Sequence, residues 1–282
     1  MIIQEALSFG RQQLLHSSSP TLDARLLLEF VLGQNHPYLV AHREQPLSAV
    51  QERSYRQLIQ RAARQEPIPY LTGQAPFFGR LFHVTPAVLI PRPETEQLIE
   101  RALKWAAHKW VQSRPPLKVV DVGTGSGCIA VTLALALPDA NIEATDISQP
   151  ALTVARQNAA AHDVANRIVF HQGNLLEPVN GRPDLIIANL PYITDEEWTS
   201  LPDGVKSYEP VSALRGGPAG LDYIHQLLSQ AGEVLSPGGA VFLEIGWKQG
   251  LAAKRLGQSF FHNAQVDLLA DYSGQDRIIA IT

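Results

Sequence analysis

From Leu117 onward, the chain alternates short apolar runs with longer segments of helical pattern, which predicts a parallel sheet with crossover helices. Five strands are expected at 118–122, 141–145, 167–171, 184–188 and 240–245. Two more, at 265–269 and 277–281, are joined by Asp271-Tyr-Ser-Gly-Gln275, a connection too short for a crossover helix. These last two strands must therefore pair antiparallel.

Five parallel strands followed by an antiparallel hairpin define the fold class. They predict an α/β, Rossmann-like sheet of seven strands with the last strand antiparallel, the layout of S-adenosylmethionine-dependent methyltransferases. Residues 94–282 are expected to form this catalytic domain, and residues 1–72 a small all-helical N-terminal domain. Prolines and glycines break any helix over 73–93, which predicts a linker that contains a short hairpin around Gly79. Pro93 then lies near the start of a new helix.

Helix signals dominate the N-terminal residues. Ser19-Pro20 supplies an N-cap followed by proline, and Gly33 supplies a stop. Ser48-Ala-Val-Gln51 has the spacing of a capping box, and the helix that it opens should end before Pro67. Four arginines gather on this helix, at positions Arg53, Arg56, Arg61 and Arg64. They form either an ordinary solvated face or a docking face for an acidic or RNA-associated partner.

The charge balance argues against a general nucleic-acid binder. The 282 residues carry a formal net charge of −4, whereas such binders are usually basic. The single cysteine, Cys128, excludes an intrachain disulfide framework and favours a reducing compartment. The first residues lack a signal-peptide pattern, and the apolar run 129–137 is about half as long as a membrane span. We therefore expect a cytoplasmic monomer without membrane contact.

Three alternating glycines lie between the first expected strand and its helix. Glycine at such a position permits a tight turn and close approach of the backbone to a ligand. The loop residues are Gly123, Thr124, Gly125, Ser126 and Gly127. Asp146 follows at the end of the second strand, where an acid can accept hydrogen bonds from both hydroxyls of a ribose. A glycine turn or a strand-end acid alone is a weak signal, but together they predict a nucleoside-type cofactor.

NAD and S-adenosylmethionine are the two candidates for this cofactor. NAD sites usually show Gly-x-Gly-x-x-Gly, because a pyrophosphate must settle on the helix N-terminus. Here the pattern is Gly-x-Gly-x-Gly directly after Asp121, which is suited to a cationic amino group such as that of a methionine moiety. S-adenosylmethionine is therefore favoured. At the third strand end, Asn174 is a candidate acceptor for the adenine amino group, and Leu175 either packs on the adenine or belongs to the core.

The fourth expected strand ends at Asn189-Leu-Pro-Tyr192, at the sheet edge where open α/β folds bind ligands. The Asn189 side-chain carbonyl and the Leu190 main-chain carbonyl can accept from both N–H groups of a planar amide or amine. Pro191 fixes the turn, and Tyr192 offers a flat face for stacking. These four are the candidate catalytic and substrate-binding residues, with Asn189 also a candidate cofactor contact. The work is positioning, and neither a general base nor a metal is required.

Several segments resemble the HemK-type (PrmC) protein-(glutamine-N5) methyltransferases, which act on peptide chain release factors. They are Pro69-Tyr-Leu-Thr-Gly73, Ile90-Pro-Arg-Pro-Glu-Thr-Glu96, Asp121-Val-Gly-Thr-Gly-Ser-Gly127, Asn189-Leu-Pro-Tyr192, Tyr208-Glu-Pro210, Ala213-Leu-Arg-Gly-Gly217 and Gly220-Leu221, with Glu244 in the strand at 238–246. The resemblance implies methyl transfer from S-adenosylmethionine to the glutamine of the Gly-Gly-Gln motif in class 1 release factors, leaving S-adenosylhomocysteine. It also implies that residues 1–72 dock the release factor. The family usually has proline where this chain has Leu190, but leucine keeps the main-chain carbonyl.

Two other substrates use the same chemistry. An adenine-N6 DNA methyltransferase would need a basic cleft and a DNA-reading domain, for which this chain has net negative charge and only about 70 helical residues. No direct DNA binding is therefore expected. A methyltransferase for a ribosomal-protein glutamine remains open, because its chemistry would be identical. A binding module without catalysis would leave 189–192 unexplained.

Overall fold

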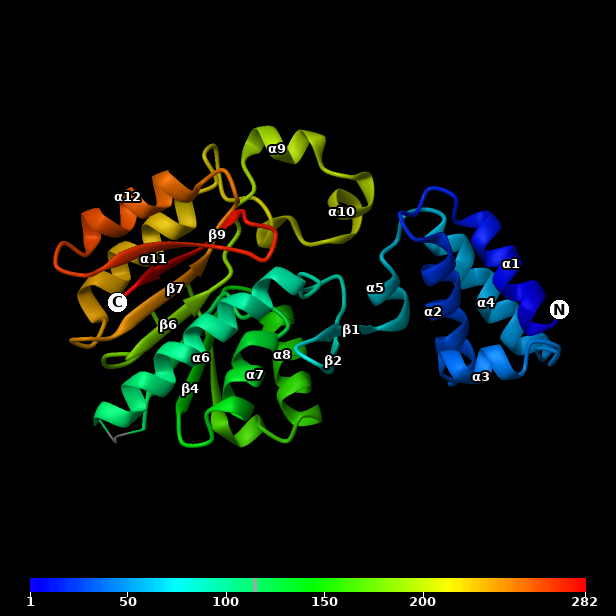
Figure 1. The fold of residues 1–282 in the computed structure, drawn as a ribbon, viewed down its shortest axis with the longest axis horizontal. Helices are drawn as coiled ribbons and strands as arrows, with labels where there is room; N and C mark the ends of the chain where they lie inside the picture. The colour runs from blue at the N-terminus through cyan, green and yellow to red at the C-terminus, as the bar shows by residue number, and fades with distance from the viewer. Residues whose placement is uncertain (114–115) are drawn as a thin grey trace. The chain divides into compact units, whose positions relative to one another are not determined.

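The structure, a computed structural model, describes residues 1–113 and 116–282. The chain divides into two compact units (Figure 1). The first unit comprises Met1–Gln74 and Pro202–Tyr208, and the second comprises Ala75–Leu201 and Glu209–Thr282. In the described part of the chain, no helix is both long and apolar enough to span a membrane.

The first unit is helical, as expected. Its helices are α1 (Ile3–Gln13), α2 (Pro20–Leu32), α3 (His36–Ala41), α4 (Ala49–Ala62), α5 (Ile68–Thr72) and α10 (Asp203–Tyr208). Gly33 caps α2 with a φ of 63° and Ser48 forms a capping box with Gln51, which confirms these two signals. Ser19 lies at the N-cap position of α2, before Pro20, but its side chain makes no capping hydrogen bond. Inside, the buried Tyr55 hydroxyl donates to the Ala24 carbonyl at 3.1 Å. This bond joins α4 to α2 across the core.

The predicted hairpin is present as β1 (Gln74–Phe77) and β2 (Arg80–His83). All of it except Gln74 belongs to the second unit. Phe77 and Phe82 meet edge to face, with ring centroids 5.9 Å apart. Helix α6 (Pro93–Ser113) starts at Pro93, as expected. Its Glu96 accepts a hydrogen bond from the Phe78 N–H at 2.8 Å, which ties the turn of the hairpin to the first turn of the helix.

Seven strands form one sheet in the order β5-β4-β3-β6-β7-β9-β8. The strands are β3 (Lys118–Val122), β4 (Asn141–Asp146), β5 (Ile168–Gln172), β6 (Leu185–Ala188), β7 (Ala240–Glu244), β8 (Val266–Ala270) and β9 (Asp276–Ile281). Strands β3 to β7 are parallel, and β9 is antiparallel to both of its neighbours. The predicted sheet is confirmed, with several strand ends shifted by one residue. The last strand lies between β7 and β8.

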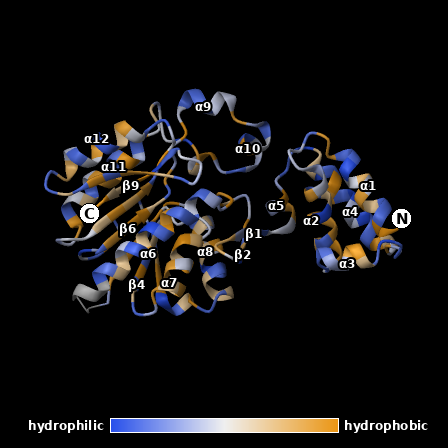
Figure 2. Ribbon diagram, viewed as in Figure 1, coloured by the Kyte–Doolittle hydropathy of each residue, from blue (hydrophilic) through white to orange (hydrophobic). Residues whose placement is uncertain are grey.

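Helices cover both faces of the sheet, so β6 and β7 are buried along their whole length and β3 along nearly all of it. Helices α6, α7 (Cys128–Ala136) and α8 (Gln149–Ala161) share one core cluster with Leu185 and Ile187 of β6. Helices α11 (Asp222–Val234) and α12 (Gly250–Phe260) share the other with Ile186. Figure 2 shows the hydrophobic colour concentrated on these strands and on α7. Helix α9 (Asp195–Ser200) and the short 3-10 turns Ala165–Arg167 and Val211–Ala213 lie in connections.

Candidate active site

A cavity of about 240 Å³ is lined by the residues that follow the carboxyl ends of β3, β4, β5 and β6. Ten of the predicted site residues line it: Gly123, Thr124, Gly125, Ser126, Asp146, Asn174, Leu175, Asn189, Leu190 and Pro191. The other three, Asp121, Gly127 and Tyr192, are not among its lining residues. The loops that line the cavity therefore come from four adjacent strands, as the strand order requires.

The glycine loop turns sharply at the end of β3. Gly123, Gly125 and Gly127 have φ of 72°, 54° and 79°, a region that residues with a side chain rarely adopt. A side chain at two of them would also be crowded. A Cβ at Gly127 would lie 3.0 Å from the backbone of Ala155 in α8, and one at Gly123 would lie 2.9 Å from Leu190 Cδ2. The alternating pattern thus allows both the turn and the close packing of its neighbours.

Asp121, at the end of β3, supports this loop through hydrogen bonds. It is fully buried, and its Oδ2 accepts from the Thr124 hydroxyl at 2.6 Å and from the Ala130 N–H at 3.0 Å. Burial raises the pKa of the carboxyl to about 7 despite these two hydrogen bonds. Its Oδ1 is buried with no hydrogen-bond partner among the residues that the structure describes. An unpartnered carboxylate oxygen at such a depth is suited to receive a donor from a ligand.

Asp146 lies on the cavity wall at the end of β4. Its Oδ2 accepts from the Gly125 N–H at 2.9 Å and its Oδ1 from the Ser148 N–H at 2.8 Å. Burial raises its pKa, and these main-chain hydrogen bonds oppose the shift. Each carboxylate oxygen can accept more than one hydrogen bond, so both remain able to accept from the hydroxyls of a ribose.

Asn174 and Leu175 form the wall beyond β5. The Asn174 side-chain amide donates to Glu177 Oε1 at 2.8 Å, which uses its nitrogen and turns its oxygen away from that partner. Leu175 is buried, has a φ of 51° and belongs to the core cluster under α11. Leu175 thus belongs to the core, one of the two alternatives that the sequence left open, and it also lines the cavity.

Asn189 is held by a residue that the sequence reasoning gave no role. Its Nδ2 donates to Thr95 Oγ1 at 2.9 Å, and the Thr95 hydroxyl donates to Glu244 Oε2 at 2.7 Å. Thr95 comes from the first turn of α6 and Glu244 from the end of β7. The amide nitrogen of Asn189 is thereby engaged, and its oxygen is the atom left for a ligand.

The backbone of Tyr192 is held from two sides. Gln249 Nε2 donates to the Tyr192 carbonyl at 2.8 Å, and also to the carbonyls of Ala219 and Gly220. A side chain at Gly216 or Gly220 would collide with the backbone of Pro191 or Tyr192. The two glycines therefore let residues 216–220 pack directly on the turn that carries the candidate catalytic residues.

An ion pair between the partly exposed Arg92 and the buried Glu209 fixes the segment that leads into α6. Arg92 Nη2 lies 2.5 Å from Glu209 Oε1, and Glu209 Oε2 accepts from the Ile90 N–H at 3.3 Å. Arg92 lines the cavity, whereas the Glu209 side chain is 2% exposed. Glu209 thus joins residues 90–92 to the chain that follows α10, within the second unit.

The residues present fit S-adenosylmethionine, which the sequence pattern favours. Asp146 can accept from a ribose, the Asn174 oxygen can accept from an adenine amino group, and the unpartnered Asp121 Oδ1 is suited to a cation. In residues 1–113 and 116–282, the structure contains no group of three or more His, Cys, Asp or Glu side chains that could hold a metal ion.

Sequence reasoning missed four supporting residues: Arg92, Thr95, Glu209 and Gln249. Arg92, Thr95 and Glu209 lie in the segments that carry the family resemblance, so a signal for them was present. Gln249 had none, because its three carbonyl acceptors lie 29 to 57 residues away and only the fold brings them together.

Solved structures share the fold of the second unit. A methyltransferase from Pyrococcus furiosus superimposes with a TM-score of 0.52 at 19% identity, over 82% of this chain and 97% of that chain. The SAM-dependent methyltransferase from Agrobacterium tumefaciens gives a TM-score of 0.50 at 16% identity, over 74% of this chain and 69% of that chain. The fold is therefore that of the Rossmann-like methyltransferases, as the strand pattern predicted.

Family models and curated relatives narrow this class. Residues 5–73 match the PrmC N-terminal domain and residues 109–201 the methyltransferase small domain. The release factor glutamine methyltransferase of Chlorobaculum tepidum is 40% identical over 265 residues, which cover 92% of this chain and 88% of that protein. That of Bacillus subtilis is 37% identical over 281 residues, covering 98% and 96%. This chain belongs to the release factor glutamine methyltransferase family, which confirms the resemblance seen in its sequence.

Proposed function

We propose that this enzyme transfers a methyl group from S-adenosylmethionine to the side-chain amide nitrogen of the glutamine in the Gly-Gly-Gln motif of class 1 release factors. The observation that carries the proposal is the state of Asn189. Its amide nitrogen donates to Thr95, so its oxygen is available as an acceptor at the cavity, which the next residue, Leu190, also lines. With the Leu190 main-chain carbonyl as the second acceptor, the pair would match the two N–H groups of a primary amide.

The lining of the cavity and the hydrogen bonds of its acidic residues support a proposal for the cofactor contacts. Asp146 is proposed to hold the ribose, Asn174 and Leu175 the adenine, and Asp121 with the loop 123–127 the methionine end. When bound, S-adenosylmethionine supplies an electrophilic methyl group on a positively charged sulfur.

The protein residues make the amide a competent nucleophile by orienting it. The lone pair of an amide nitrogen is delocalised, so both N–H groups must be held for that lone pair to face the methyl carbon. Asn189 and Leu190 hold them, and the Tyr192 ring stacks on the amide plane. Held in this way, the amide nitrogen would be the acceptor of the methyl group that the cofactor supplies, and it would lose one proton to water. The products would be the methylated amide and S-adenosylhomocysteine.

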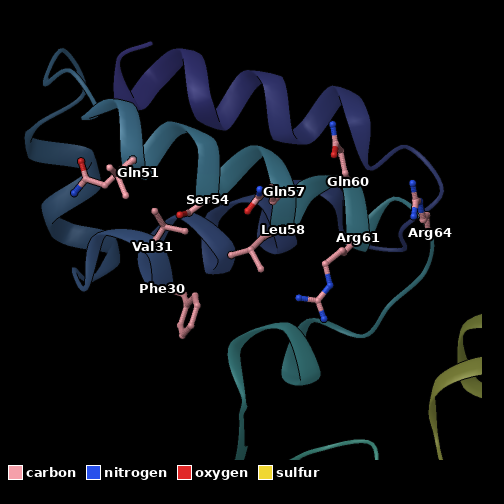
Figure 3. A pocket seen from close by; sticks show the side chains of 10 residues that line it. Phe30, Val31, Gln51, Ser54, Gln57, Leu58, Gln60, Arg61 and Arg64 are labelled. Atoms are coloured by element: carbon pink, nitrogen blue, oxygen red, sulfur yellow. The ribbon is translucent and has the colours of Figure 1, made fainter.

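The three parts of the chain divide the work. Residues 94–282 are proposed as the catalytic domain, residues 73–93 as a linker, and residues 1–72 as the part that docks the release factor. The first unit has a hollow of about 610 Å³. Figure 3 shows its lining, in which apolar side chains of α2 and α4 and two arginines are labelled. Its apolar members include Phe30 and Leu58, and its charged members are Arg61 and Arg64. Such a mixed surface is typical of protein contacts.

We further propose that the enzyme acts as a cytoplasmic monomer, without a metal and without binding DNA directly. The formal net charge of −4 supports a protein substrate over DNA, whose phosphates favour basic partners.

The test is labelling from radioactive S-adenosylmethionine with purified release factor, ribosomal proteins or DNA as acceptor. The expected result is label on the Gly-Gly-Gln peptide, and none when its glutamine is replaced by alanine. Label on a ribosomal protein or on DNA, but not on the release factor, would overturn the proposal.

A further inference from the structure

One buried carboxylate connects two of the four candidate catalytic residues. Glu244 lies at the end of β7, is 1% exposed and does not line the cavity. Its Oε2 accepts from the Thr95 hydroxyl at 2.7 Å, and its Oε1 accepts from the Tyr192 hydroxyl at 3.2 Å. Thr95 in turn accepts from Asn189 at 2.9 Å. Asn189 and Tyr192 thus share one anchor on the far side of the residues that face the cavity.

The direction of these hydrogen bonds follows from the chemistry of their end group. An ionised carboxylate can only accept, so the single proton of the Thr95 hydroxyl must point to Glu244. The Thr95 oxygen then offers only a lone pair to Asn189, and a lone pair selects the NH₂ of the amide over its oxygen. The charge on Glu244 therefore decides which way the Asn189 amide is turned.

Several groups around Glu244 bear on its charge. Burial raises the pKa of its carboxyl, while the Thr95 hydroxyl, the charge of Arg277 and the Tyr192 hydroxyl oppose this shift. Glu94 adds a repulsive negative charge. Burial is the largest of these influences and leaves the pKa of Glu244 above its ordinary value, while the two hydroxyl donors and Arg277 favour the ionised form that the hydrogen bonds require.

We propose that Glu244, acting through Thr95, is a positioning residue that turns the Asn189 amide oxygen toward the reacting nitrogen and fixes the Tyr192 ring. This role rests on the proposed function. A flipped Asn189 would present NH₂ to a substrate amide that also has only N–H groups on that side, and the lone pair of the substrate would no longer be directed at the methyl group. Losing the anchor should therefore lower turnover and leave cofactor binding intact.

The matched pair of variants is Thr95→Val and Thr95→Ser. Valine keeps the shape of threonine without its hydroxyl, whereas serine keeps the hydroxyl and loses a methyl group. Turnover on the release factor, its KM, and the affinity for S-adenosylhomocysteine are measured for both. We expect Thr95→Val to lower kcat by about tenfold or more, Thr95→Ser to stay within about threefold of the wild type, and both to bind S-adenosylhomocysteine normally. Glu244→Gln should resemble Thr95→Val, because a glutamine has one acceptor oxygen for two donors.

A double-mutant cycle separates positioning from general packing. If Thr95 acts through Asn189, adding Thr95→Val to Asn189→Ala should produce no further loss of kcat. A full additional tenfold loss in that background would overturn the proposal, as would wild-type turnover in Thr95→Val or equal loss in Thr95→Val and Thr95→Ser. Failure of the wild-type enzyme to label the release factor would instead overturn the proposed function, and this role with it.

Discussion

At the residue scale, Leu190 contributes more than its main-chain carbonyl. Its side chain is 4% exposed, lines the cavity and packs against the space above Gly123. It therefore joins the proposed catalytic turn to the cofactor loop through a direct apolar contact. A proline at this position would stiffen the turn but would fill that space differently. The residue that departs from the family pattern is thus part of the packing between the two halves of the site.

Asn189 provides the first prediction at this scale. Asn189→Ala removes a proposed acceptor for the substrate amide and leaves a substrate N–H unpaired, at a cost of about 1–3 kcal/mol. We expect kcat to fall at least tenfold while the affinity for S-adenosylmethionine stays nearly unchanged. Steady-state kinetics and calorimetric titration measure the two quantities. Equal losses in both would show that Asn189 belongs mainly to the cofactor site.

Asp121 provides a pH-dependent prediction. Its pKa is raised to about 7 by burial, and only the ionised form attracts a cation. Affinity for S-adenosylhomocysteine should therefore fall as the pH drops below about 7, by roughly tenfold for each pH unit that protonates the group. Titrations between pH 5.5 and 8 test this. Asp121→Asn should bind weakly with a flat profile, and a slope that persists in this variant would assign the pH dependence to another group.

The raised pKa of Asp121 affects folding stability in the direction opposite to its effect on cofactor affinity. An exposed aspartate has a pKa near about 4, so between that value and about 7 the folded protein binds a proton that the unfolded chain releases. The contribution of Asp121 to folding is therefore fully present at low pH and is lost as the pH rises through about 7. The proton thus stabilises the fold under the conditions in which it weakens cofactor binding.

At the scale of elements, the loop between β3 and α7 shows why alternating glycines occur there. Gly123, Gly125 and Gly127 all have positive φ, and Gly127 lies against Ala155 of α8. Residues 216–220 use glycine in a similar way, because Gly216 and Gly220 allow their backbone to pack closely on the turn after β6. Both loops depend on contact with an element that is distant in sequence.

Gly127 and Gly274 form a matched pair that tests this packing. Both have positive φ, 79° and 78°, but a side chain at Gly274 would meet nothing within 4 Å. Alanine in the left-handed region costs about 1–2 kcal/mol. Gly274→Ala should therefore lower the free energy of unfolding by no more than this amount. Gly127→Ala should lose about 1–3 kcal/mol more, because its Cβ would meet Ala155 at 3.0 Å. Urea denaturation compares the two, and equal losses would contradict a role for close packing.

At the scale of the whole molecule, the two units differ in architecture and in proposed task. The first is a helical unit with its own buried core around Tyr55, and the second is a sheet covered on both faces. The proposed docking surface lies on the first and the cavity on the second. Substrate recognition and chemistry should therefore be separable by mutation.

Phe30→Ala tests that separation. Phe30 is 50% exposed and lies at the edge of the hollow on the first unit. We expect the variant to raise KM for the intact release factor by about threefold or more, and to leave KM for a short Gly-Gly-Gln peptide unchanged. Leu15→Ala is the control, because Leu15 is 75% exposed on the same unit but does not line the hollow. An equal effect of both variants, or a raised KM for the peptide, would argue against docking at this surface.

Much of the fold could be predicted from local pattern. Capping signals at Ser48 and Gly33, the run of apolar strands and the short connection at 271–275 each act over a few residues, and the structure confirms them. The order of the strands was less accessible. The insertion of β9 between β7 and β8 depends on which antiparallel edge can pair with β7, and this is decided by packing over the whole sheet.

The sequence by itself determined the elements and the residue types at the ends of four strands, because strand and turn propensities are local. Only the tertiary structure decided how those residues are oriented. In the sequence, Thr95 of α6 is 94 residues from Asn189 and 149 residues from Glu244 of β7. These three residues nevertheless form one chain of hydrogen bonds. The direction of an amide depends on its partners, and its partners are set by how the sheet and the helix pack together.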